Sequence, residues 1–447
     1  MNNALARKTR LARNMARMQR LFTKAYQFLP PTWVLPDDIA DLERRFGPDP
    51  AESKLIYIVK PDHLCQGKGI FLTTELQRMK NAAAEMRMKN ESAVVQRYIT
   101  RPMLIDGLKF DLRLYFLVAG KLIGDGGLDL RCFLFRDGLV RLCTTAYEAP
   151  TPETMDNKCM HLTNYAVNKH SSDFQANTSA EDDGSGSKRS LRWFLRYIED
   201  EYGERERRKL WFKLMGLCVK TVLTVQPTLE AECQSAFPKD LSGGQMGWRC
   251  FEILGVDVML DSKRKPYLIE INHLPSFTTD SPLDDDIKRR LLDQTLDLTC
   301  GNLTSRDRKV YEQLARGRRV AGGGVPPPAH GTAASTGLPE VGMPTGESPL
   351  DFLTYKDFDR AFPPPQDAAK LARECGEIAE RVRELFRPVH DARRSNVGRM
   401  NTRDFPAAVA AGAVAAPCAG VGGGPGATQR PPPLPAGGRC APASENG

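Results

Sequence analysis

The amino-acid sequence predicts an α+β protein in which helices flank mixed β-sheets, followed by a long disordered C-terminal tail. Short apolar runs rich in β-branched and aromatic residues alternate with segments of helical periodicity as far as about residue 300. Beyond that point glycine, proline and alanine predominate. Hydrophobic residues make up 41% of the 447 positions and charged residues 26%, as is typical of globular proteins. At roughly 100–200 residues per domain, the length allows two or three folded units.

Residues 1–29 are expected to form a basic helix. Apolar residues recur there at spacings of three and four with basic residues between them, and the run FLPPTWVLP then ends the pattern. The chain carries a net charge of +8, so an acidic partner is favoured. Charge alone does not distinguish a solvated structural helix from one that contacts such a partner.

Residues 30–300 form the expected folded region. Strands are predicted at IYIVKP, AVVQRYI, KFDLRLYFLVAG, CFEILGVDVML and KPYLIEINH, and the last two are joined by the polar turn DSKRK. TTELQRMKNAAAEMRMK and residues 191–224 have helical periodicity, whereas residues 171–190 read as a loop. CFLFRDGLVRLCT is predicted to be a hairpin with its turn at Asp137-Gly138, because Asp-Gly is a common two-residue turn.

The remaining chain divides by composition. Residues 301–350 are expected to be a Pro/Gly-rich linker, and residues 351–395 to carry a helical segment. Residues 396–447 contain few large apolar side chains, so burial cannot offset their chain entropy and disorder is expected. No stretch of about 18 apolar residues predicts a membrane span. The eleven cysteines lack CxxC or zinc spacing, which favours reduced thiols.

Three polar residues on the last two predicted strands are candidate metal ligands. Glu270 and Asn272 are two positions apart and share a strand face, and pairing of the two strands brings Asp257 beside them. Carboxylate and amide oxygens suit Mg²⁺. Three polar side chains on the wet face of a sheet would give the same pattern.

Glycines and lysines form a candidate phosphate site. Lys60 ends a predicted strand, and the turn Gln66-Gly67-Lys68-Gly69 follows it. Glycines let backbone N–H groups approach phosphate oxygens, although an ordinary hairpin loop would also explain this turn. Further along, KFDLRLY places Lys109, Asp111 and Arg113 on one strand face. With Thr163 and Asn164, these residues favour a nucleotide and metal cleft without naming its reaction.

Taken together, these stretches resemble the tubulin tyrosine ligase-like family, a branch of the ATP-grasp enzymes. The resemblance covers roughly residues 30–295. It rests on PPTWVLPDD, IYIVKPDHLCQGKGIFLT, VVQRYITRPMLIDGLKFDLRLYFLV, KCMHLTNYAVNKH and FEILGVDVMLDSKRKPYLIEINHLPSFTTDSPLD, which occur in the family's order. The ending NHLPSFTTDS is most similar to the branch that adds glutamate chains to tubulin tails.

The resemblance implies an ATP- and Mg²⁺-dependent protein-glutamate ligase. In such an enzyme the γ-carboxylate of a tubulin-tail glutamate becomes an acyl phosphate, which the amine of free glutamate then attacks. The implied partners are tubulin or microtubules and free glutamate, without nucleic acid or membrane. The implied protein is a monomer of the cytoplasm and cytoskeleton, with the cilium or basal body as a more specific location. The helical segment within 351–395 is similar to a microtubule-contacting element of this branch.

The resemblance also assigns residues to roles. It places Lys60, Gln66 and Gly67 at the ATP phosphates, with Lys60 counted as catalytic and Gln66 also near the acceptor. The remaining nucleotide contacts that it implies are Gln96, Arg97, Tyr98, Ile99, Lys109, Phe110, Asp111, Thr163 and Asn164. It assigns Mg²⁺ to Asp257, Glu270 and Asn272. Catalytic Arg131 is expected to bind the amino-acid carboxylate, beside Tyr165, Lys188 and Lys288.

Two alternatives keep the same fold. One is a tubulin-binding protein without ligase activity, and the other is a ligase that uses glycine or tyrosine in place of glutamate. A nucleic-acid role is less favoured, because basic and aromatic residues are not interleaved as in single-strand binders.

Overall fold

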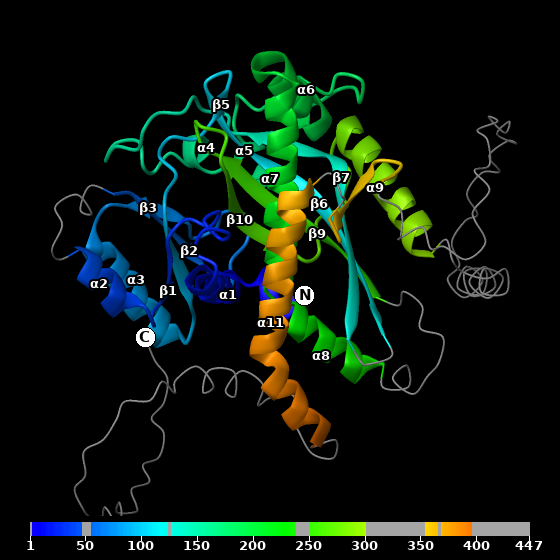
Figure 1. The fold of residues 1–447 in the computed structure, drawn as a ribbon. Helices are drawn as coiled ribbons and strands as arrows, with labels where there is room; N and C mark the ends of the chain where they lie inside the picture. The colour runs from blue at the N-terminus through cyan, green and yellow to red at the C-terminus, as the bar shows by residue number, and fades with distance from the viewer. Residues whose placement is uncertain are drawn as a thin grey trace, which may run out of the picture. The chain divides into compact units, whose positions relative to one another are not determined.

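The computed structural model describes residues 2–46, 55–123, 127–237, 250–300, 354–364 and 368–395. Two antiparallel sheets organise this part of the chain, and they correspond to the α+β class predicted from the sequence (Figure 1). The linker expected at 301–350 and the tail expected at 396–447 lie outside the described residues. Among the described helices, none is long and apolar enough to cross a membrane.

The smaller sheet has four strands in the order β1-β4-β2-β3. Their bounds are Thr32–Leu35 (β1), Tyr57–Pro61 (β2), Phe71–Thr73 (β3) and Ala93–Arg97 (β4). Helices α2 (Ile39–Phe46) and α3 (Leu76–Lys89) cover one face and bury a core that includes Trp33, Tyr57 and Met79. The strands predicted at IYIVKP and AVVQRYI and the helix of residues 73–89 are thereby confirmed.

The larger sheet follows the order β10-β9-β6-β7-β12-β11, with β5 beside β6 and β8 beside β7. The strands are β5 (Leu104–Ile105), β6 (Leu108–Leu122), β7 (Leu128–Leu142), β8 (Lys188–Ser190), β9 (Cys250–Leu260), β10 (Pro266–Asn272), β11 (Thr354–Tyr355) and β12 (Phe358–Phe362). The predicted pairing of the two strands around DSKRK is confirmed, because β9 and β10 are antiparallel neighbours. The predicted loop 171–190 is a loop except for β8.

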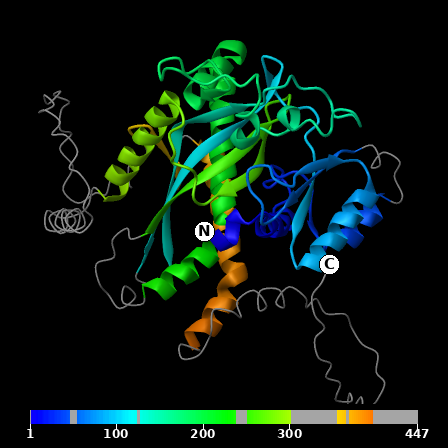
Figure 2. The same cartoon turned by 180° about the vertical axis from the view of Figure 1, so that it is seen from behind.

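Helices cover both faces of the larger sheet. One face packs against α6 (Leu191–Tyr202), α7 (Glu204–Leu223), α8 (Gln226–Ala236) and α11 (Ala369–Ser395). The other face packs against α9 (Pro282–Cys300), which lies apart from the other helices in Figure 2. Even-numbered residues of β6 such as Leu112 and Phe116 belong to the first core, and odd-numbered residues such as Leu117 belong to the second.

The predicted N-terminal helix is present as α1 (Lys8–Leu21), after a π-helical turn at Asn2–Ala6. Its apolar stripe, including Leu11 and Met15, is buried in the main core. The segment that follows is also anchored there, because the Tyr26 hydroxyl donates to the Lys220 carbonyl at 2.8 Å. This helix therefore has a structural role.

The hairpin predicted at Asp137-Gly138 is wrong. Both residues lie inside β7, which runs without a turn beside β6. Leu114 pairs with Gly138 and Phe116 with Leu134, so Tyr115 lies opposite three residues of β7. Asp137 is a member of this bulge, and its carboxylate accepts from Gly138 N at 2.9 Å and from Arg290 Nη2 at 2.6 Å. Pairing with a long neighbouring strand overrides the local turn preference.

The folded core also continues past its expected end near residue 300. β12 pairs with β7, and the Trp211 indole of α7 donates to Asp359 Oδ2 of β12 at 3.0 Å. α11, the helix expected within residues 351–395, lies alongside α7 (Figure 1). The side chain of Leu371 packs against Gly216 of α7. Strand β12 and helix α11, both distant in sequence from the other elements, thus complete the main core.

Candidate active site

A cavity of about 1080 Å³ is lined by residues of both sheets. Its size suits a nucleotide together with a small second substrate. Lysines and arginines outnumber carboxylates on its wall. Most of the predicted site residues line it, namely Lys60, Gln66, Gly67, Gln96, Arg97, Tyr98, Ile99, Lys109, Asp111, Thr163, Asn164, Tyr165, Lys188, Asp257, Glu270, Asn272 and Lys288.

The predicted phosphate turn follows β2 and needs its glycines. Gln66, Gly67 and Gly69 have φ values of 60°, 79° and 68°, a region that favours glycine. A Cβ on Gly67 would lie 2.9 Å from the Val167 side chain, so the turn packs closely against the segment after α4 (Lys158–His161). Backbone N–H groups of such a turn are open to an anion.

Helix α1 supports this turn, a feature that the sequence did not reveal. Lys8 Nζ donates to the Leu64 carbonyl at 2.8 Å, and Thr9 N donates to Asp62 Oδ1 at 3.0 Å. Lys8 lines the cavity as well. Because these contacts join positions more than fifty residues apart, helical periodicity alone could not identify them.

Two buried lysines face the cavity. Lys60 Nζ donates to Gln96 Oε1 at 2.9 Å, and Lys109 Nζ donates to the Tyr98 hydroxyl at 2.7 Å and the His161 carbonyl at 2.8 Å. Burial lowers the pKa of each lysine to about 8. It also lowers the pKa of His161 to about 4, so this imidazole is neutral near pH 7. An anionic ligand would stabilise the charged form of both lysines and so offset the free-energy cost of burying them.

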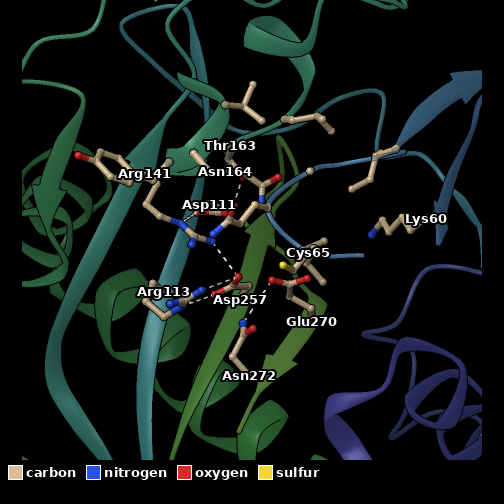
Figure 3. A pocket seen from close by; sticks show the side chains of 18 of the residues that line it. Lys60, Cys65, Asp111, Arg113, Arg141, Thr163, Asn164, Asp257, Glu270 and Asn272 are labelled. Carbon is tan, nitrogen blue, oxygen red and sulfur yellow. Dashed lines mark hydrogen bonds and ion pairs between the residues drawn. The ribbon is translucent and has the colours of Figure 1, made fainter. Parts of the chain in front are cut away.

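Asp257 lies between two arginines (Figure 3). Arg113 Nη2 donates to Asp257 Oδ2 at 3.0 Å, and Arg141 Nη2 lies 2.8 Å from the same oxygen. Arg141 Nε also donates to Asp111 Oδ1 at 2.7 Å, and the Thr163 hydroxyl donates to Asp111 Oδ2 at 2.5 Å. Burial raises the pKa of Asp257, but the two guanidinium groups outweigh burial and hold it well below its usual range. Asp257 is therefore ionised.

Glu270 and Asn272 lie next to Asp257, as the strand argument predicted. Glu270 pairs directly with Asp257 across β9 and β10, and Asn272 Nδ2 donates to Glu270 Oε1 at 3.2 Å (Figure 3). Burial and then the neighbouring Asp257 raise the pKa of Glu270. A buried carboxylate, a half-buried carboxylate and an amide oxygen fit a divalent cation, which would remove the repulsion between the carboxylates. Their metal role remains a prediction.

The residues predicted to face the amino acid form a second charged group. Asp284 of α9 accepts from Lys188 Nζ at 2.5 Å, and Lys288 Nζ lies 2.9 Å from its other oxygen. The Lys188 ammonium lies 3.8 Å from the centroid of the Tyr165 ring. All four side chains line the cavity, which makes this group a candidate carboxylate subsite.

Arg131 does not line the cavity, contrary to the position predicted for it beside the amino acid. Arg131 pairs with Ala119 in the sheet and contacts Asp129. It lies ten residues before Arg141 on β7, roughly 30 Å away at the rise of a strand. Arg141 stands in the cavity instead, directly opposite Asp111 in the register of β6 and β7. Arg131 and Arg141 are an even number of positions apart on β7, so only the register between β6 and β7 distinguishes them.

Phe110 was also assigned wrongly to the nucleotide site. It is buried in the main core, with its ring centroid 5.4 Å from that of Phe194. Lys109 and Asp111 face the cavity, so the residue between them must point to the opposite side of the sheet.

Comparison with known proteins places the chain in a family. Residues 1–308 match the model of the tubulin-tyrosine ligase family. The chain is 42% identical over 316 residues to tubulin polyglutamylase ttll6 of Danio rerio, covering 70% of this chain and 37% of that protein. It is 41% identical over 317 residues to human tubulin polyglutamylase TTLL6, covering 70% and 32%. A probable beta-tubulin polyglutamylase of Tetrahymena thermophila is 42% identical over 296 residues, covering 66% and 23%.

The chain thus spans between 23% and 37% of the length of these relatives. The matched region includes β1 to β10 and α9, and with them every residue named above as lining the cavity. The chain belongs to the tubulin-tyrosine ligase family.

Proposed function

We propose that the chain is an ATP-dependent ligase that joins free glutamate to glutamate γ-carboxylates in tubulin C-terminal tails. One observation carries this proposal: two buried lysines, a glycine turn and the Asp257–Glu270–Asn272 group meet in one cavity. This combination supplies phosphate recognition and oxygen ligands together. The relatives that are named tubulin polyglutamylases support the choice of glutamate and tubulin.

In the proposed complex the adenine lies against residues 96–99, and Lys60, Lys109 and Lys8 neutralise the phosphates. Glu270, Asn272 and Asp257 would hold Mg²⁺, which supplies further neutralisation of phosphate charge. Their proximity to the phosphate turn supports this assignment. Lysines held at fixed positions favour phosphoryl transfer because they need little reorganisation during the reaction.

The proposed reaction has two steps. The acceptor γ-carboxylate attacks the terminal phosphorus and gives an acyl phosphate with release of ADP. The amine of glutamate then attacks the acyl carbon, forms the amide and expels phosphate. Arg141, Lys188 and Lys288 would orient the free glutamate through its carboxylates, while the basic cavity wall favours an acidic tail. The cytoskeleton is therefore the proposed location.

Mass spectrometry of intact tubulin tests the proposal. Tubulin is incubated with the chain, ATP, Mg²⁺ and equal amounts of glutamate, glycine and tyrosine. Mass steps of one glutamate residue are expected, and they should disappear when ATP is omitted. Mass steps of one glycine or tyrosine residue would instead identify that amino acid as the substrate. Unmodified tubulin, with the chain shown to be folded, would contradict ligase activity.

A further inference from the structure

The hydroxyl of Tyr115 is a buried polar group that makes no hydrogen bond within the described part of the chain. The side chain is fully buried, and among the described residues its hydroxyl has no hydrogen-bond partner. Burying an unpaired hydroxyl is costly, so folded proteins rarely retain one without a reason. Tyr115 also lines the large cavity, where a ligand could provide the missing partner.

The backbone around Tyr115 is unusual in the same place. Tyr115 is the residue of β6 that lies opposite the three-residue bulge of β7, between the pairs Leu114–Gly138 and Phe116–Leu134. Bulges often occur beside active sites, where they redirect a side chain. A Cβ on Gly138 would lie 2.4 Å from the Arg113 carbonyl, so this close strand approach depends on glycine.

The surroundings of the hydroxyl indicate which ligand it meets. Arg113, Arg141, Asp257 and Asp284 all act electrostatically on it, so it lies near both charged groups described above. Burial raises the pKa of Tyr115 to about 12, and the hydroxyl therefore keeps its proton and acts as a donor.

The position along β6 separates Tyr115 from the nucleotide. Lys109, which faces the proposed phosphate site, lies six residues earlier on the same strand, a distance of roughly 20 Å. Asp284, in contrast, forms ion pairs with Lys188 and Lys288, the two lysines of the candidate carboxylate subsite. Arg141 and Asp284 both act electrostatically on the Tyr115 hydroxyl, which associates it with this subsite and not with the phosphates.

We propose that the Tyr115 hydroxyl donates a hydrogen bond to a carboxylate oxygen of the incoming amino acid. This inference rests on the proposed ligase function and adds a residue that selects its amino-acid substrate. The hydroxyl is held in place by the packing of the ring beneath α9, in the core that contains Leu283 and Ile287. A donor fixed in this way loses little conformational entropy on binding.

Two Tyr-to-Phe variants separate this role from a structural one. Tyr115→Phe removes an oxygen that has no hydrogen-bond partner among the residues the structure describes, so its thermal unfolding midpoint should equal or exceed that of the wild type. Tyr26→Phe is the matched control, because the Tyr26 hydroxyl is bonded to the Lys220 carbonyl and does not line the cavity. Its midpoint should fall, and its kinetic constants should not change.

Kinetic and binding measurements then decide. Tyr115→Phe is expected to raise the KM for glutamate about tenfold and to leave the KM for ATP within about twofold. Calorimetric titration of glutamate, with a non-hydrolysable ATP analogue present, should show the same loss of affinity without turnover. Equal glutamate KM and affinity in Tyr115→Phe and wild type would overturn the inference.

The same titration distinguishes failure of this inference from failure of the proposed function. If the wild type binds glutamate but attaches none to tubulin, the ligase proposal fails, and the affinity of Tyr115→Phe still decides the role of Tyr115. If the wild type binds no glutamate in the presence of the analogue, both are overturned.

Discussion

Lys60 and Lys109 stand in the cavity as buried cations with few compensating charges. Because burial lowers each pKa to about 8, both ammonium groups lose their protons as the pH rises above that value. Affinity for ATP should therefore fall by at least about tenfold between pH 7 and pH 9. Titration of a fluorescent ATP analogue across this range measures the effect.

A variant identifies the source of this pH dependence. Lys60→Met should bind ATP more weakly than the wild type at pH 7. Its ATP affinity should also fall less between pH 7 and pH 9, because one of the two titrating groups is gone. The affinity for adenosine, which carries no phosphate, should vary little with pH in either protein. An ATP affinity that stays constant from pH 7 to pH 9 would contradict this assignment.

Glu270 gives a second test at the scale of one side chain. Glu270→Gln keeps the shape but removes a charge from the proposed Mg²⁺ site, so turnover should fall by at least about a hundredfold. Stability should be retained or increased, since the half-buried Glu270 carboxylate is repelled by Asp257. Steady-state kinetics and urea unfolding measure the two effects.

Glu85→Gln, on the exposed surface of α3, serves as the control and should leave both quantities unchanged. Full activity of Glu270→Gln would remove this residue from the metal site.

Residues that lie close together because they share one strand or one hairpin can be grouped from the sequence. Asp257, Glu270 and Asn272 were grouped correctly because strand alternation and a short turn fix their positions. Arg141 was missed and Arg131 was chosen because that decision needs the register between two long strands. Tyr115 was missed for another reason: an unpaired hydroxyl becomes visible only when its whole surroundings are known.

Among the elements, the bulge of β7 is the most informative. Gly138→Ala would place a methyl group against the Arg113 carbonyl, at 2.4 Å in the present geometry. Because the obstacle is backbone, we expect a loss of about 1–3 kcal/mol in the free energy of unfolding and a displaced Arg113. Urea denaturation gives the first quantity, and a crystal structure of the variant shows the second.

Gly376→Ala provides the contrasting change. Gly376 lies in α11, and a Cβ there would meet no atom within 4 Å. Alanine favours a helix over glycine, so this variant should gain up to about 1 kcal/mol. Equal effects of the two substitutions would show that the bulge tolerates a side chain.

The bulge also explains why one element was predicted wrongly. Asp-Gly is a sound local signal for a turn, yet here the carboxylate of Asp137 caps Gly138 N and binds Arg290 within a continuous strand. The helices and most strands were predictable because their periodicity determines which face is buried. No comparable pattern in the sequence predicted that β12 would pair with β7.

At the scale of the whole molecule, α11 is part of the main core. The described residues up to His390 belong to one compact unit, and Ile378 is 1% exposed among side chains of the larger sheet and α7. Ile378→Ala should therefore cost about 2–5 kcal/mol and lower the stability of the entire unit in a single transition. Denaturation followed by both circular dichroism and tryptophan fluorescence checks this.

Glu380→Ala, an exposed change on the same helix, should leave the transition nearly unaltered. If Ile378→Ala instead produced two separate transitions, α11 would be an appended element and not a component of the core.

The position of Asp257 between Arg113 and Arg141 has a kinetic consequence. A guanidinium engaged with one carboxylate is poorly available to a second, so both arginines are poorly available to an amino acid while no cation is bound beside Asp257. A cation bound to Asp257 would weaken the pairing of that carboxylate with both arginines, while Arg141 keeps its hydrogen bonds to Asp111. The ligands should then arrive in a compulsory order, with ATP and its cation first and glutamate second, and glutamate alone should associate weakly with the empty protein.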